Sequence, residues 1–127
     1  MLIQFVKPDF VFENEAGSLK QLVHDGWKQV NVISSIAGAF RGGHYHRYNS
    51  EGFYIIQGSF RLIVWQEEGE KEEYLMHAGD MFLIPPMVFH SFEYYEDTIL
   101  VSMYSRGVEL SETEKDIWTE KAGDREK

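Results

Sequence analysis

Apolar and polar residues alternate in short runs along most of this chain. The clearest alternating apolar positions are Val30, Val32 and Ile36 in one run and Phe60, Leu62 and Val64 in another. Residues two apart on a strand share a face, so this alternation predicts strands that bury one face. Further strand candidates, rich in β-branched and aromatic residues, are 52–57, 71–76, 81–84, 89–94 and 98–104. Such regular short spacing predicts an all-β barrel or sandwich.

The C-terminal part carries the only helical pattern. Ser111 precedes Glu112, Thr113 and Glu114, which resembles a helix cap followed by acidic residues in the first turn. A short helix over this segment would rest Trp118 against the barrel. The polar tail 120–127 is predicted to fray.

Composition limits the classes of partner. The 127 residues suffice for one core, so residues 1–127 are predicted to form a single domain. The net charge of −9 disfavours nucleic acid and anionic membranes, although a local basic side chain can still bind a diphosphate. The N-terminus does not resemble a signal peptide and no apolar run is long enough to span a membrane, so a cytoplasmic location is predicted.

A set of histidines and one carboxylate carries the candidate chemistry. His44 and His46 are two apart on a predicted strand, so both imidazoles reach the same side of the sheet. Glu51 shares its parity with Phe53 and therefore requires a compensating charge or proton. His90 follows a hydrophobic strand and can join the set from an antiparallel neighbour. The chain has no cysteine, so any metal must use these ligand types, which suit zinc, iron, manganese, nickel or copper. The remaining histidines, His24 and His77, are predicted to be structural or surface residues.

The spacing of these residues resembles the two conserved patterns of the cupin family. The first pattern is met in full by Gly38, His44, His46, Glu51 and Gly58, and the second is met by Gly79, Pro85 and His90. Two positions depart from the second pattern, since Met87 replaces a Gly and Tyr94 replaces an Asn. The resemblance implies a jelly-roll barrel with one divalent metal held by His44, His46, Glu51 and His90. Met87 leaves the shape of the turn after Pro85 open, because glycine adopts left-handed backbone angles more easily.

Segments 41–46 and 51–60 carry a narrower resemblance to small cupins of nucleotide-sugar metabolism. They are similar to dTDP-4-keto-6-deoxyhexose 3,4-ketoisomerases and to the zinc-bearing C-terminal cupin of capsular-polysaccharide UDP-sugar epimerase-reductases. The ketoisomerases generally have Gln at the position of Glu51 and work without a metal, whereas the capsular cupin keeps the carboxylate. Glu51 therefore favours the metal-bearing branch and zinc.

This resemblance implies proton abstraction beside the ketone of a nucleotide-linked sugar. If all three histidines bind the metal, then Tyr54, Tyr104 or a water on the metal is left to move the proton. Arg41 is a candidate clamp for a diphosphate or sugar. Two alternatives remain open: a metal-dependent dioxygenase or lyase, and a non-catalytic sugar-binding or regulatory cupin. The family also implies a homodimer, in which residues 2–6 could pair with the partner's sheet.

Overall fold

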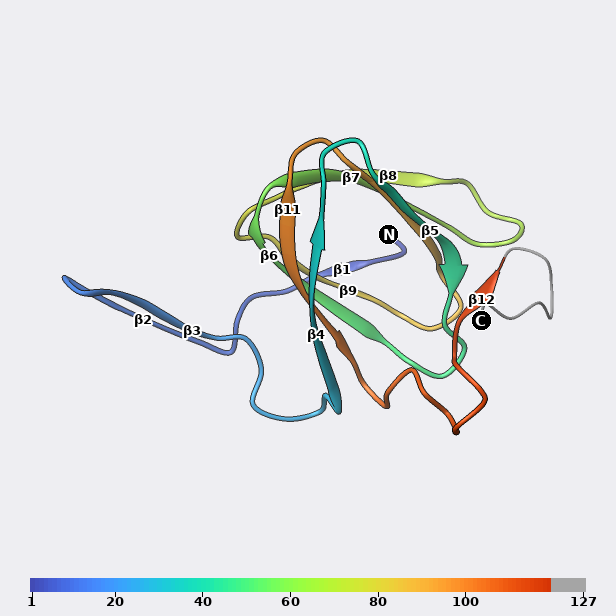
Figure 1. The fold of residues 1–127 in the computed structure, drawn as a ribbon, viewed down its shortest axis with the longest axis horizontal. Coiled ribbons are helices and arrows are strands. Elements are labelled where there is room, and N and C mark those ends of the chain that lie inside the picture. The colour runs from blue at the N-terminus through green and yellow to red at the C-terminus, as the bar shows by residue number, and fades with distance from the viewer. Residues whose placement is uncertain (120–127) are drawn as a thin grey trace.

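Two antiparallel β-sheets packed face to face form the body of the molecule in the computed structural model, which describes residues 1–119 (Figure 1). The strand order of the first sheet is β1 (Gln4–Phe5), β9 (Met81–Ile84), β6 (Glu51–Gln57), β11 (Thr98–Tyr104), β4 (Gln29–Ser35). The strand order of the second is β12 (Trp118–Thr119), β5 (Phe40–Tyr45), β10 (Phe89–Tyr94), β7 (Ser59–Trp65), β8 (Glu72–His77). Every strand predicted from the alternating pattern is present, and the arrangement is an all-β jelly roll. Over residues 1–119 no helix is long and apolar enough to cross a membrane.

The two sheets do not close into the barrel that was predicted. Among residues 1–119 no hydrogen-bonded strand pair joins one sheet to the other, so the structure is a sandwich. One edge of each sheet is a strand of only two residues, β1 or β12, which offers few backbone groups for closing the gap.

The core lies between the two sheets and is rich in aromatic rings. Phe53 stacks on Phe82 within the first sheet at 4.9 Å between ring centroids, and Phe60 stacks on Phe92 within the second at 5.1 Å. The rings of Phe53 and Phe92 meet across the sandwich at 5.3 Å. The candidate metal ligands lie beside this packing, since the ring of His90 contacts that of Phe92.

Strand β4 buries the face opposite to the one that its alternating valines predicted. Val30 and Val32 are 60% and 68% exposed, whereas Ser35 on the alternate row is buried. The inward row contains Ile33, which packs against the core, and polar side chains that have partners inside: Ser35 accepts a hydrogen bond from Arg41, and Gln29 accepts one from the backbone of Val108. Burial of Ile33 and the satisfied hydrogen bonds of this row therefore outweigh the burial of the two valines.

The predicted C-terminal helix does not form. The Ser111 hydroxyl accepts the backbone N–H of Glu114, as a cap would, but the backbone N–H of Leu110 then bonds to the Glu114 carbonyl and closes a turn. The chain continues as β12, where Trp118 pairs with Tyr45 of β5. Strand pairing with the body overrides the weak local helical preference, since short helices gain little stability by themselves. The predicted frayed tail 120–127 lies outside the described residues.

A hairpin near the N-terminus was not anticipated from the sequence. Strands β2 (Phe10–Asn14) and β3 (Gly17–Gln21) pair with each other and project away from the sandwich (Figure 1). Every residue of both strands is exposed. The preceding strand β1 pairs with β9 of its own chain and forms an edge of the first sheet.

Candidate metal centre

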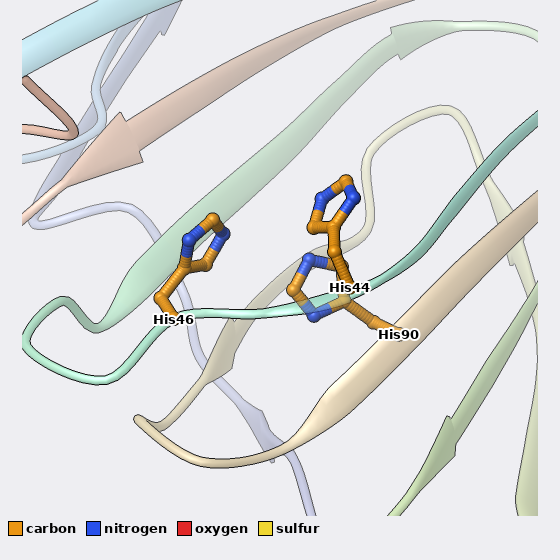
Figure 2. Close-up of side chains that lie close together, drawn as sticks. All are labelled: His44, His46 and His90. Carbon is orange, nitrogen blue, oxygen red and sulfur yellow. The ribbon is translucent and has the colours of Figure 1, made fainter. Parts of the chain in front are cut away.

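Three imidazoles gather inside the open end of the sandwich. His44 lies on β5, His46 directly follows β5, and His90 lies opposite His44 on the neighbouring strand β10 (Figure 2). Each offers one ring nitrogen, and these three nitrogens lie within 4.8 Å of one another. His46 and His90 are buried and His44 is partly exposed, so the cluster opens to a ligand on one side.

The backbone of Gly42 allows the two strands to approach closely enough for this cluster. A β-carbon at position 42 would lie 2.6 Å from the His90 carbonyl oxygen and 2.7 Å from the Ser91 α-carbon. The φ of Gly42 is 122°, which side-chain-bearing residues rarely adopt. The pairing of β5 with β10 shifts register between His90 and Ser91 at this point, and such bulges are common beside functional sites.

Glu51 is buried beside two of the imidazoles. Its Oε1 lies 2.9 Å from Nε2 of His46 and 3.6 Å from Nε2 of His90. Its Oε2 accepts a hydrogen bond of 2.6 Å from the Ser102 hydroxyl. One carboxylate oxygen therefore faces the cluster while Ser102 orients the other. Ser102 was not predicted as a site residue. Strand alternation places this polar residue on the inward row of β11, but it does not reveal that Glu51 is its partner.

The outer nitrogens of two imidazoles are fixed by backbone carbonyls. Nδ1 of His46 donates to the Asp116 carbonyl at 2.6 Å, and Nδ1 of His90 donates to the Val88 carbonyl at 3.1 Å. Each bond sets the tautomer so that Nε2 faces Glu51 and the cavity, as in metal sites whose histidines are held by a second hydrogen bond.

These groups fit a divalent metal. Adjacent ligands bound about 2.1 Å from a metal lie roughly 3.0–3.5 Å apart at octahedral or tetrahedral angles. The distances of 2.9 Å and 3.6 Å from Glu51 to His46 and His90 are close to that range. Three imidazoles and one carboxylate are also a donor set that zinc, manganese and iron accept.

Electrostatics support a cation at this position. Burial alone would favour neutral groups, but hydrogen bonding to the Glu51 carboxylate raises the pKa of His46, and the same contact lowers the pKa of Glu51. Burial lowers the pKa of His90 to about 3, so this imidazole stays neutral near pH 7. The Glu51 carboxylate therefore favours a positive charge on the neighbouring group, which is also what a bound metal would supply.

A cavity of about 430 Å³ adjoins the cluster. Ile33, Phe53 and Phe92 form an apolar part of its wall. Its polar wall includes Arg41 and Tyr104 as well as three of the candidate ligands, His44, Glu51 and His90. The size suits a small organic ligand, for which apolar walls with a few polar groups are typical.

The structure separates the two candidate tyrosines. Tyr104 lines the cavity, its ring 5.1 Å from that of His46. Tyr54, the other tyrosine that the sequence suggested for the site, does not line the cavity. Successive side chains on a strand alternate, so Tyr54 faces away from the side that Glu51 and Phe53 share. Burial and the neighbouring Glu51 carboxylate raise the pKa of Tyr104, which keeps the phenol protonated.

Arg41 sits in the cavity wall with part of its guanidinium already bound. Its Nε donates to the Ser35 hydroxyl at 2.9 Å and its Nη2 donates to the Ser34 carbonyl at 3.3 Å. These bonds orient the side chain toward the cavity. Tyr94, which replaces the Asn of the family pattern, is buried and lines the same cavity, a position that sequence reasoning left unassigned.

The other sequence expectations are met in part. His24 and His77 are exposed and pair with Asp9 and Asp80, away from the cluster. Met87 adopts a φ of 71° although it carries a side chain, so the turn keeps the left-handed geometry that a glycine would supply. The backbone N–H of Met87 donates to the His46 carbonyl, which ties this turn to the site.

Comparison with known proteins places this geometry in a family. The family model described as the cupin domain matches residues 33–104, which include all four candidate ligands. The chain belongs to the cupin family. Among curated proteins, this cupin is similar to an oxalate decarboxylase of Arthroderma benhamiae, with 32% identity over 94 residues. That match covers 63% of this cupin but only 22% of the relative.

Solved structures of other proteins share the fold. One is the sugar 3,4-ketoisomerase QdtA from Thermoanaerobacterium thermosaccharolyticum in complex with TDP, with a TM-score of 0.73 and 17% identity, covering 91% of this cupin and 86% of that chain. Another is the capsular polysaccharide assembling protein CapF from Staphylococcus aureus, with a TM-score of 0.65 and 19% identity, covering 87% of this cupin and 33% of that chain. At these identities the likeness concerns the fold.

Proposed function

We propose that this cupin binds one divalent metal, with zinc favoured, and isomerises or epimerises a nucleotide-linked keto sugar by proton transfer. The observation that carries the proposal is the meeting of three histidine nitrogens within 4.8 Å beside a cavity whose wall contains two of these histidines, His44 and His90, together with Arg41 and Tyr104. The shared fold with sugar 3,4-ketoisomerases supports the substrate class.

Each residue has a distinct role in this proposal. His44, His46, His90 and Glu51 would hold the metal. A bound divalent metal would polarise the ketone and stabilise the enolate that forms when a neighbouring carbon loses its proton. A water in the cavity would accept the proton that leaves the carbon, and Tyr104, a phenol that burial keeps protonated, would donate one to the enolate at the end of the transfer. Arg41 would bind a phosphate of the nucleotide, and the apolar wall would exclude water.

Proton exchange tests this function directly. The zinc-loaded protein is incubated with dTDP- and UDP-linked 4-keto sugars in deuterated water, and NMR follows deuterium entering the carbon beside the ketone. Exchange at one carbon that disappears after chelation is the expected result. If the same sugars bind by thermal shift but no carbon exchanges, the cupin is a non-catalytic sugar-binding protein.

A metal-dependent lyase is the second candidate, and the 32% identity to an oxalate decarboxylase favours it. Manganese suits the same three-histidine and carboxylate set. Incubation of the manganese-loaded protein with oxalate separates the two functions, because release of carbon dioxide and formate without sugar exchange would select the lyase. Oxygen consumption by the iron-loaded protein would indicate a dioxygenase.

The exposed hairpin supports a homodimer. An isolated two-stranded hairpin is marginally stable in water, yet Phe12 and Leu19 on β2 and β3 are 52% and 57% exposed. Val30 and Val32 on the outer face of β4 are exposed as well. In a two-fold dimer the hairpin of each copy would cover this face of the other.

Introduced cysteines test the dimer cleanly because the chain has none. A mixture of the Phe12→Cys and Val32→Cys proteins is expected to form a disulfide-linked pair faster than either protein alone. A monomeric mass by light scattering, with no cross-linked species in the mixture, would contradict the dimer.

A further inference from the structure

The C-terminal segment meets the candidate metal centre at one buried residue. Asp116 is fully buried, and it contacts both His46 and the loop that follows His46. Its partners lie about 70 positions earlier in the chain. Asp116 has no role in the proton transfer described above, so its burial requires another explanation.

The Asp116 carboxylate binds the loop after His46. Oδ1 accepts the backbone N–H of Arg47 at 2.8 Å, and Oδ2 accepts those of Tyr48 and Asn49 at 3.0 Å and 3.1 Å. The Asn49 side-chain amide also donates to Oδ2 at 2.9 Å. Hydrogen bonds to an ionised acceptor are stronger than those between neutral groups, so the carboxylate fixes three consecutive residues.

The backbone of Asp116 binds the imidazole itself. Its carbonyl oxygen accepts Nδ1–H of His46 at 2.6 Å. The same residue therefore holds the His46 ring and the chain that leaves His46. This leaves Nε2 directed at Glu51, the direction that metal binding requires.

Asp116 is itself held firmly in place. Its backbone N–H donates to the Val108 carbonyl at 2.7 Å, and Nε1 of Trp118 donates to Oδ1 at 2.9 Å. Trp118 is buried, and the Arg47 guanidinium lies 3.7 Å from the centre of its ring. Pairing of Thr119 with His44 anchors the end of the segment on β5.

We propose that Asp116 is a positioning residue for the metal ligand His46, so that segment 108–119 forms part of the metal centre. This inference rests on the proposed metal binding. Loss of the carboxylate would release the loop 47–49, move the Asp116 carbonyl and let the His46 ring rotate. Outer groups that orient a ligand typically contribute about 10–100-fold in metal affinity.

The test compares zinc affinity in two variants. Asp116→Asn keeps the size but replaces one acceptor oxygen with an N–H donor that faces other donors. Asp80→Asn is the matched control, because Asp80 also accepts a backbone N–H, from His77 at 2.8 Å, but lies away from the histidine cluster. Affinity is measured by competition with a coloured chelator, at a temperature where circular dichroism shows the apo proteins folded. The absorption spectrum of the cobalt-loaded protein reports ligand geometry separately from stability.

The expected result is zinc binding about 10–100-fold weaker in Asp116→Asn with an altered cobalt spectrum, and little change in Asp80→Asn. If Asp116→Asn does not fold, Trp118→Phe decides: it removes the donor to Oδ1 but keeps a ring, and weaker binding is expected again. Unchanged affinity and an unchanged spectrum in the folded variant would overturn the positioning role while leaving the proposed metal function intact. Absence of zinc and cobalt binding by the wild-type protein would overturn both.

Discussion

Tyr104 lies directly opposite Glu51 in the antiparallel pair of β11 and β6. Both side chains reach the cavity that His44 and His90 also line. Tyr54, three residues after Glu51 on the same strand, lies on the other face because an odd separation reverses the side of the sheet. The pair of tyrosines therefore offers an internal comparison, since one is beside the candidate ligands and the other is not.

Replacing Tyr104 with Phe should abolish most proton transfer while leaving the fold intact. A positioned proton donor contributes about 10²–10⁴-fold to a rate, so deuterium exchange into the keto sugar should slow by that factor. Tyr54→Phe is the control and should retain the wild-type rate. Equal losses in both variants, or none in Tyr104→Phe, would remove Tyr104 from the reaction.

Single alanine substitutions of His44, His46 and His90 should each remove tight metal binding. Each takes away one of three nitrogens that lie within 4.8 Å of one another, and the remaining set is incomplete. His77→Ala is the matched control because His77 is exposed and paired with Asp80. Zinc content after dialysis measures the effect. A His77 variant that loses zinc as well would show that the metal sits elsewhere.

Metal removal should lower the unfolding temperature of the wild-type protein only. A ligand at 100 times its Kd stabilises the folded state by about 2.7 kcal/mol, so chelation should produce a clear shift in Tm. The His90→Ala protein should show the same Tm with and without chelator. A wild-type Tm that does not respond to chelation would contradict a structural contribution of the metal.

Metal binding should release a proton from His46. The contact with Glu51 raises the pKa of His46, so its Nε2 keeps a proton below that pKa, and a cation must displace it. Apparent zinc affinity should therefore rise by about tenfold per pH unit below this pKa and level off above it. Calorimetry in two buffers of different ionisation heat measures the proton. Affinity that is constant across about pH 5–8 would contradict this coupling.

The clustering of the candidate ligands could be predicted from strand alternation and from a family pattern. His44 and His46 share a face through strand alternation, and the spacing to Glu51 and His90 matches a family pattern. The same alternation rule places Tyr54 on the face opposite to that of Glu51. Ser102 and Asp116 could not be found in this way, because their partners Glu51 and His46 are 51 and 70 residues away in the chain. The predicted C-terminal helix was wrong for the same reason, because Trp118 pairs with Tyr45 of β5, which is far away in the sequence.

Gly42 allows β5 to approach β10 beside the candidate metal centre, so substituting it should lower both the stability of the protein and its affinity for zinc. An alanine there would place its β-carbon 2.6 Å from the His90 carbonyl oxygen, so β5 or β10 must move and His90 must shift relative to His44. Overpacking of this kind costs about 1–3 kcal/mol, and the unusual backbone angle adds a further cost of about 1–3 kcal/mol.

Gly43→Ala is the control: its φ of 78° is also unfavourable for alanine, but nothing lies within 4 Å of the added carbon. Chemical unfolding and zinc titration of both variants separate the effects. Gly43→Ala should lose only stability, while Gly42→Ala should lose more stability and zinc affinity as well. Equal zinc affinity in the two variants would mean that the close approach of β5 to β10 is not needed to bring the ligands together.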